Sequence, residues 1–321
     1  MNGGVARIRT GGVTALVGGT PMLRLSALEP RGDVRLYAKL EGFNPTGSIK
    51  DRVAVWLLDD AERRGILFPG ARVVEASSGN TGISLAMVCR ERGYGLTVVM
   101  SRKASRERVA LLELLGTDIV LTSRDGGADE ARRVADELAG RHVDDGWVRI
   151  SQHRHHGLVG MHARFTAGEI LSQLDEPPDY VVAGVGTGAT VMGLARGIRA
   201  RYPNVTVIGA HPAPTLSQQE GLRNVRATAP PEIFDETMLT ELVTVEDDAA
   251  IEASRDIIAQ TGLLVGVSSG TALAAARMLI RRGAAGSFVL VFPDRAERYL
   301  STNLVPAAGA GDPDRAPSVP A

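Results

Sequence analysis

The sequence has little cysteine, no excess of either charge and no long apolar run. Cys89 is the one cysteine among 321 residues, so a disulfide within the chain and a cysteine-rich zinc site are both excluded. Thirty-six basic and 37 acidic residues give a net charge of -1, which is too small for the positive field of a nucleic-acid-binding protein. No apolar stretch reaches the roughly 18 residues of a membrane span. We therefore expect a cytoplasmic globular protein with neither a nucleic-acid nor a membrane partner.

Lysine is also scarce. Only three of the 36 basic residues are lysines, at positions Lys39, Lys50 and Lys103, and the others are arginines. Chemistry that needs an amine nucleophile therefore has three internal candidates besides the amino terminus. Cys89 lies in an apolar helical pattern and is interpreted as a packing residue, not as a nucleophile.

Strand-like and helix-like segments alternate along most of the chain. Strands are predicted at 34–40, 71–75, 96–100, 119–121, 179–183, 205–210 and 288–292, and helices at 51–64, 83–92, 105–115, 249–260 and 272–282, with another ending at Arg201. Such alternation requires crossover connections and predicts an α/β fold of two lobes, each with a mostly parallel sheet flanked by helices. We assign 1–44 to a segment joining the larger lobe, 45–150 to the smaller lobe, 151–306 to the larger lobe and 307–321 to a disordered tail.

A glycine-rich loop at 184–190 (GVGTGAT) lies between a predicted strand and a predicted helix. Small residues let backbone N–H groups approach a phosphate, and the helix N-terminus adds its dipole. A dinucleotide would also fit G-x-G-x-x-A, but the next strand ends in Gly209-Ala210-His211 and offers no acidic residue for a ribose. A tight turn without a ligand stays open as an alternative.

Two further loops follow predicted strands. The loop 77–82 (SSGNTG) offers hydroxyls, an amide and free N–H groups, which form an anion nest suited to a carboxylate, although the same residues are ordinary helix caps. The loop 44–52 (NPTGSIKDR) puts Lys50 at a helix start, where the helix dipole lowers the pKa of an amine. Taken alone, Lys50 would be an ordinary surface lysine.

Together, a phosphate cradle, a carboxylate nest and an amine on one side of parallel sheets are what an amino acid joined to pyridoxal phosphate needs. Five segments, NPTGSIKDR, SSGNTGISLA, GVGTGAT, GVSSGTA and PDRAERYLST, resemble in order those of the fold-type-II pyridoxal-phosphate enzymes. The resemblance is to the cysteine synthase and cystathionine β-synthase branch and extends from about 18 to 304. It implies the fold of the tryptophan synthase β-subunit and, as partners, a second copy of the chain in a homodimer and possible contact with a sulfur-carrier protein.

The resemblance also implies roles for individual residues. Lys50 would form the Schiff base and act as the catalytic base, Asn80 would contact the ring hydroxyl, and Ser268 would face the pyridine nitrogen. The cofactor phosphate would be bound by Gly186, Thr187, Gly188, Ala189 and Thr190. The substrate carboxylate would be bound by Ser77, Ser78, Gly79, Thr81 and Gln152. A metal is not implied.

The implied reaction is β-replacement on a β-substituted L-serine, through an α-aminoacrylate, with a sulfur nucleophile and L-cysteine or a close analogue as product. A neutral serine opposite the ring nitrogen makes the ring a weaker electron sink than an aspartate would, which favours loss of the β-substituent over transamination. The segment GLRNVRATAPPEIFDETML resembles O-phosphoserine sulfhydrylases more than O-acetylserine enzymes, and it makes Arg223 the candidate for binding a phosphate leaving group.

The nucleophile stays open, because SQHRHHGLVGMH stands where the family usually has an Asn-Pro-Ala-Asn run. The histidines 153, 155 and 156 lack a cysteine or carboxylate at zinc spacing and are interpreted as a solvated loop. The alternatives are a synthase that adds an amine, of the 2,3-diaminopropionate type, a serine or threonine dehydratase, and a catalytically silent binding relative.

Overall fold

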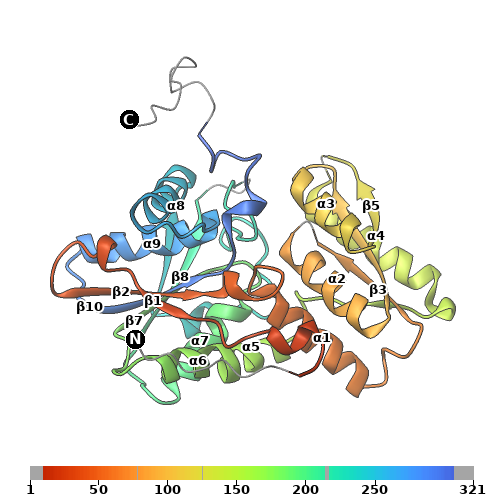
Figure 1. Ribbon diagram of the computed structural model, residues 1–321, viewed down its shortest axis with the longest axis horizontal. Helices are drawn as coiled ribbons and strands as arrows, with labels where there is room; N and C mark the ends of the chain where they lie inside the picture. The colour runs from red at the N-terminus through yellow and green to blue at the C-terminus, as the bar shows by residue number, and fades with distance from the viewer. Residues whose placement is uncertain (1–9, 78, 125, 214–216, 307–321) are drawn as a thin grey trace, which may run out of the picture.

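The computed structural model describes residues 10–77, 79–124, 126–213 and 217–306. These residues form two sheets, each covered by helices, side by side along the long axis of the molecule (Figure 1). The predicted α/β fold of two lobes with mostly parallel sheets is confirmed. The tail 307–321 and Ser78 lie outside the described residues.

The larger sheet has six strands in the order β1-β2-β10-β7-β8-β9. Their bounds are β1 Met22–Arg24, β2 Val34–Leu40, β7 Tyr180–Gly184, β8 Thr206–Pro212, β9 Glu241–Val245 and β10 Gly286–Phe292. The short β1 runs antiparallel to β2, whereas the other neighbours are parallel. Because β10 pairs with β2, the first and last strands of the chain share this sheet, and the smaller sheet is formed by the chain between them.

The smaller sheet has four parallel strands in the order β5-β4-β3-β6. Their bounds are β3 Arg72–Ala76, β4 Gly95–Ser101, β5 Asp118–Thr122 and β6 Trp147–Arg149. All four strands therefore end at the same edge, which is where parallel sheets place their ligands.

The helices fill the crossovers between strands. The α-helices are α1 Lys50–Arg63, α2 Asn80–Arg92, α3 Arg106–Leu114, α4 Gly127–Arg141, α5 Gly157–Met161, α6 Ala167–Gln173, α7 Ala189–Arg199, α8 Asp247–Thr261 and α9 Val267–Arg281. A π-helical stretch, η5 His162–Thr166, joins α5 to α6. Short 3-10 helices are η1 Val13–Leu16, η2 Ser26–Leu28, η3 Glu41–Phe43, η4 Val143–Asp145, η6 Glu236–Met238 and η7 Ala296–Arg298. None of the described helices combines the length and the apolar composition that a bilayer crossing requires.

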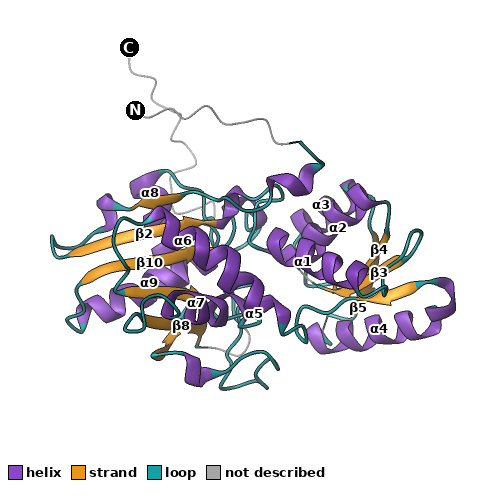
Figure 2. Cartoon of the chain, turned by 90° about the horizontal axis from the view of Figure 1, so that it is seen from below, coloured by secondary structure: helices purple, strands orange, loops and turns teal. Residues whose placement is uncertain are grey.

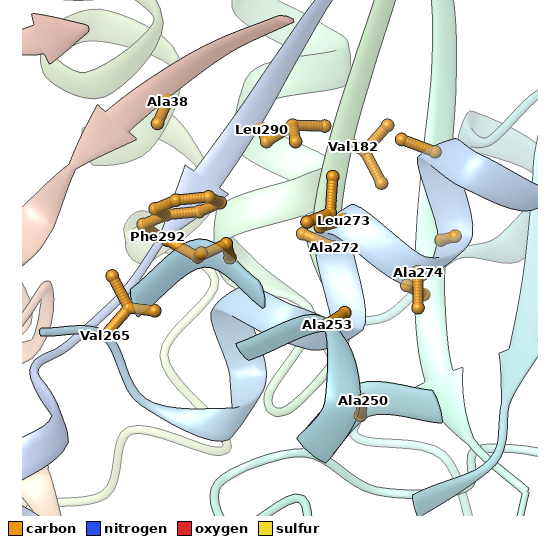
Figure 3. Packing of buried hydrophobic residues seen from close by; sticks show 14 of the residues in the cluster. Ala38, Val182, Ala250, Ala253, Val265, Ala272, Leu273, Ala274, Leu290 and Phe292 are labelled. Carbon is orange, nitrogen blue, oxygen red and sulfur yellow. The ribbon is translucent and has the colours of Figure 1, made fainter. Parts of the chain in front are cut away.

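Side chains of β10 alternate between two buried layers of the larger lobe. Phe288, Leu290 and Phe292 pack with residues of α8 and α9, whereas Val289 and Val291 pack on the opposite face with residues of α7. Figure 3 shows the first layer, in which Ala272 of α9 lies beside the strands, while α8, with Ala250 and Ala253, packs against α9. A strand buried on both faces is read from the sequence as a continuous apolar run, as here.

The smaller lobe is also covered on both faces (Figure 2). Val73 and Val98 pack with residues of α1 and α2, while Val74 and Val99 pack with alanines of α4. This sandwich fixes the starts of α1 and α2 above the ends of the strands, and those two starts carry the residues of the site.

Two helices begin earlier than predicted. α2 begins at Asn80 instead of residue 83, and α9 begins at Val267 instead of residue 272. Gly, Ser, Thr and Asn have low helix propensity and indicated a loop, but burial of both segments overrides that preference. Helix α4, whose glycine-rich first turn interrupts its apolar pattern, was not among the predicted helices.

Candidate active site

Three of the predicted residues meet at the edge between the lobes. Lys50 is the first residue of α1, Thr81 lies in the first turn of α2, and Gln152 follows β6. The Lys50 Nζ donates a hydrogen bond to Gln152 Oε1 at 3.1 Å, and Thr81 Oγ1 donates to the same oxygen at 2.9 Å. Residues far apart in the sequence thus converge on one amide oxygen, which orients the Lys50 amine.

The Lys50 amine lies in a poorly solvated site. Burial lowers the pKa of Lys50 to about 8, and the nearby carboxylates of Glu75 and Asp294 oppose part of that shift. Burial likewise raises the pKa of Glu75 to about 7, against the effect of Arg149, whose Nη1 donates to Glu75 Oε2 at 2.7 Å. A substantial fraction of Lys50 is therefore neutral near pH 8, as a nucleophilic amine requires.

Helix α1 is fixed to the larger lobe by an arginine two residues after Lys50. Arg52 makes paired hydrogen bonds to Glu41, at 2.7 and 2.9 Å, and to Glu169, at 2.7 and 2.6 Å. Although burial alone would raise it, hydrogen bonds from Arg52 and Lys39 lower the pKa of Glu169 to about 2. The position of the Lys50 backbone therefore depends on charged groups of the other lobe.

In the predicted carboxylate nest, the Ser77 side chain forms hydrogen bonds within the loop itself. Ser77 Oγ accepts the backbone N–H groups of Gly79 at 3.3 Å and of Gly82 at 3.2 Å. The first-turn N–H groups of α2 start beside this turn and point out of the helix end. Ser78 was predicted for the same nest but lies outside the described residues.

Asn80 has two partners that the sequence analysis did not assign. Its Nδ2 donates to Asp294 Oδ2 at 2.6 Å, and its Oδ1 accepts from Arg298 Nη1. Both partners belong to PDRAERYLST, which was recognised as a motif without roles for its members. Charged residues that closely follow the carboxyl end of a buried strand, within seven residues of Phe292, were the signal that could have identified them.

The glycine loop has the features of a phosphate cradle. A Cβ at Gly186 would lie 2.2 Å from the carbonyl oxygen of Gly221, so no larger residue fits there. The backbone N–H groups of Gly186, Thr187 and Gly188 donate to no other described residue, and α7 begins immediately afterwards at Ala189. Free donors at the start of an 11-residue helix favour an anion.

His162 lies behind the end of this loop and was missed in the sequence. Its Nδ1 is 2.9 Å from Thr166 Oγ1, and its Nε2 is 3.4 Å from Thr190 Oγ1. Burial lowers the pKa of His162 to about 3, so the ring is neutral. It therefore supports Thr190 through hydrogen bonding without adding charge.

Ser268 and Arg223 are the two remaining predicted site residues. Ser268, in the first turn of α9, is buried, and its hydroxyl makes no hydrogen bond to a described residue. The Arg223 backbone N–H donates to the carbonyl oxygen of Val185 at 3.0 Å, which places this residue beside the glycine loop. Among the described residues no carboxylate pairs with the partly buried Arg223 guanidinium.

The remaining histidines and Cys89 have separate environments. His155 Nε2 is 2.9 Å from Asp60 Oδ2, while burial, together with the charges of Arg223 and Lys50, lowers the pKa of His153 to about 3. Burial raises the pKa of Cys89 to about 12, so the thiol is not ionised. In the part of the chain that the structure describes, no three His, Cys, Asp or Glu side chains gather as metal ligands.

A comparison with protein families decides the class of protein. The family described as "Pyridoxal-phosphate dependent enzyme" matches residues 13–294. The chain belongs to this family. The predicted cofactor, pyridoxal phosphate, and the predicted enzyme class, a pyridoxal-phosphate-dependent transferase, are thereby confirmed.

Individual relatives narrow the branch. The chain is 38% identical to the cysteine synthase of Aquifex aeolicus over 299 residues, which covers 91% of each chain. It is 35% identical to a Staphylococcus aureus cysteine synthase over 305 residues, covering 91% of this chain and 96% of that one. Membership of the cysteine synthase branch is confirmed, whereas the likeness to O-phosphoserine sulfhydrylases stays a prediction.

Two solved structures share the fold over nearly the whole chain. An O-ureido-L-serine synthase superposes with a TM-score of 0.89 at 34% identity, covering 95% of this chain and 98% of that one. A cysteine synthase of Entamoeba histolytica superposes with a TM-score of 0.88 at 27% identity, covering 97% of this chain and 95% of that one. Relatives with different names thus share one scaffold, so the fold alone does not identify the nucleophile.

Proposed function

We propose that the protein replaces the β-substituent of an L-serine derivative with a sulfur nucleophile and forms L-cysteine or a close analogue. The observation that carries the proposal is the Lys50 amine, held by Gln152 at the start of α1 with its pKa lowered to about 8. Two cysteine synthases among the relatives support the sulfur nucleophile.

The residues described above fit pyridoxal phosphate. The free backbone N–H groups of Gly186, Thr187 and Gly188 suit its phosphate, and the unpartnered hydroxyl of Ser268 suits its ring nitrogen. The remaining N–H of the Asn80 amide suits its ring hydroxyl, and Lys50 would bond to its aldehyde carbon. The turn of Ser77, Gly79 and Thr81, together with Gln152, would bind the substrate carboxylate.

When bound, pyridoxal phosphate supplies an electron sink that makes the Cα–H bond of an attached amino acid acidic. Lys50 in its neutral form removes the Cα proton and later returns it to the product. Gln152 Oε1 accepts a hydrogen bond from Lys50 Nζ and would thereby restrict the positions that the amine can take. Thr81 donates to the same oxygen, so the amide keeps one hydrogen bond when Lys50 moves.

The test is a screen of O-acetylserine, O-phosphoserine and serine against sulfide, thiosulfate, an amine and a hydroxyurea, with product analysis and the cofactor spectrum. We expect a sulfur-containing product from at least one activated serine, and none from Lys50→Ala with the same folded signal by circular dichroism. Turnover by Lys50→Ala at the wild-type rate would refute the assignment of Lys50. A spectrum unchanged by every substrate would indicate the silent relative instead.

We further propose that the leaving group is phosphate and that Arg223 binds it. Arg223 lies beside the glycine loop, and the pKa of its guanidinium is lowered by burial and by the neighbouring cation Arg132, so an anion would relieve both effects. Arg223→Ala should raise the KM for O-phosphoserine about tenfold or more and leave O-acetylserine nearly unaffected. Arg226→Ala is the matched control, because Arg226 is exposed and bound to Glu236 at 3.0 Å. Equal losses for both substrates would remove this role.

One observation favours a second candidate. O-ureido-L-serine synthase has the same fold at 34% identity, and the region after Gln152 departs from the usual run of the family. There His153 has a buried Nδ1 without a hydrogen-bond partner among the described residues, which a polar nucleophile could supply. If a nitrogen or oxygen nucleophile forms product faster than sulfide does in the screen, the second candidate function takes the place of the first.

A further inference from the structure

The inference concerns a buried carboxylate that the proposed mechanism does not use. Asp294 follows β10 and is only 3% exposed. Its Oδ2 accepts hydrogen bonds from Asn80 Nδ2 at 2.6 Å and from the Tyr299 hydroxyl at 2.5 Å. Its Oδ1 is buried and has no hydrogen-bond partner among the described residues.

Asp294 lies between two residues proposed for the cofactor ring. On one side it contacts Asn80, and on the other its Oδ1 lies over Gly266, where an added Cβ would be 2.1 Å from that oxygen. Gly266 precedes α9 and is two residues from Ser268. The carboxylate therefore connects the proposed hydroxyl side of the ring to the proposed nitrogen side.

The backbone at Asp294 is also fixed to the Lys50 loop. Ser48 and Asp294 form an antiparallel bridge, and the Ile49 N–H donates to the carbonyl oxygen of Pro293 at 2.8 Å. A movement of the Asp294 backbone would thus displace Lys50, because Lys50 follows Ile49 directly.

Asp294 and Arg298 leave the Asn80 amide one possible orientation. Arg298 donates to Asn80 Oδ1, while Asp294 accepts from Asn80 Nδ2. Rotating the amide by half a turn would set NH2 against a guanidinium and a carbonyl against a carboxylate, so both contacts would become repulsive. In the present orientation the second N–H of Nδ2 remains available.

We propose that Asp294 is a positioning residue that, with Arg298, orients the Asn80 amide so that its second N–H meets the ring oxygen of the cofactor. The inference rests on the proposed function, because it takes Asn80 to face that oxygen. The bridge to Ser48 in the Lys50 loop holds the Asp294 backbone in place for this role, and Arg298 is itself held by the carbonyl oxygen of Thr46.

The experiment measures the dissociation constant of pyridoxal phosphate from the apo-protein and the position of the visible absorption band, with no substrate added. Asp294→Ala should weaken binding about tenfold and shift the band, because the amide loses one of its two restraints. Asp294→Asn keeps the shape and should give a smaller change in the same direction. If the alanine variant does not fold, Asp294→Asn provides the test in its place.

A double-mutant cycle with Asn80→Ala separates positioning from a general structural role. If Asp294 acts through Asn80, adding Asp294→Ala to Asn80→Ala should change the dissociation constant less than about twofold. Tyr299→Phe is the matched control, since it removes the other hydrogen bond to Asp294 Oδ2, and it should leave the band in place.

Three results would overturn the inference. They are an undiminished effect of Asp294→Ala in the Asn80→Ala background, an equal band shift in Tyr299→Phe, and wild-type spectrum and affinity in both Asp294 variants. A wild-type protein that binds no pyridoxal phosphate would instead refute the proposed function, so the two failures are distinguishable.

Discussion

Burial lowers the pKa of both Lys39 and Lys50, but their amines are bound differently. Lys39 is 0% exposed, and its Nζ donates to the Thr20 carbonyl at 2.6 Å, to Glu169 Oε2 at 2.8 Å and to Gln173 Oε1 at 2.9 Å. All three N–H groups of an ammonium are thus satisfied, one of them by a carboxylate.

Lys50, by contrast, has one hydrogen-bond acceptor among the described residues, the neutral oxygen of Gln152. Burial lowers the pKa of both lysines, but at Lys39 a hydrogen bond and the charge of Glu169 counteract it directly. The difference teaches that burial alone does not make a lysine a nucleophile. The number and charge of the acceptors decide whether the amine stays a structural cation or becomes free to react.

The largest effect is expected from Lys39→Ala. Removing the cation leaves Glu169 with the Arg52 guanidinium and the Gly19 N–H, and it breaks a largely buried pair, which should lower the free energy of unfolding by about 3–5 kcal/mol. Urea unfolding followed by circular dichroism measures it. Arg90→Ala, at an exposed position of α2, is the control and should change stability by less than about 0.5 kcal/mol. A wild-type urea midpoint for Lys39→Ala would show that the two lysines do not differ in this way.

The next effect concerns the pH dependence of cofactor attachment. Only the neutral amine reacts, so the rate of covalent attachment to apo-protein should rise with pH and level off above a midpoint near 8, the pKa of Lys50. Below that midpoint the rate should fall about tenfold per pH unit. Stopped-flow absorbance measures it, and borohydride trapping with peptide mapping identifies the lysine. A midpoint near 10, the ordinary range for lysine, or a trapped Lys39 would contradict the comparison.

Much of this contrast was predictable from the sequence, and part of it was not. NPTGSIKDR predicted that Lys50 starts a helix after a loop, because its turn residues and the apolar spacing that follows are local signals. Nothing near Lys39 indicated its role, since its partners Glu169 and Gln173 come from α6, 130 and 134 residues away. Long-range polar pairs leave no periodicity in a sequence.

The same reasoning applies to the ends of helices and to Asn80. The motif SSGNTGISLA identified Asn80, but its low helix propensity hid the fact that α2 begins there. Its partners Asp294 and Arg298 are 214 and 218 residues away, and only the pairing of β10 beside β2 brings them to the site. Motifs thus identified which residues gather, while sheet topology determines which of them touch.

The smallest expected effect tests how much the charge of Glu75 contributes to the pKa of Lys50. Glu75 opposes the lowering of the Lys50 pKa, so Glu75→Gln should move the midpoint of cofactor attachment to lower pH. Because burial raises the pKa of Glu75 to about 7, Glu75 is ionised above that pH and takes up a proton below it. The two rate profiles should therefore differ between about pH 7 and the plateau above the wild-type midpoint, where the variant is faster, and converge on either side of that range. Arg149 keeps its bond to Asp136 at 2.8 Å in the variant, which limits structural loss. Identical profiles across the range would mean that Lys50 is set by burial and Gln152 alone.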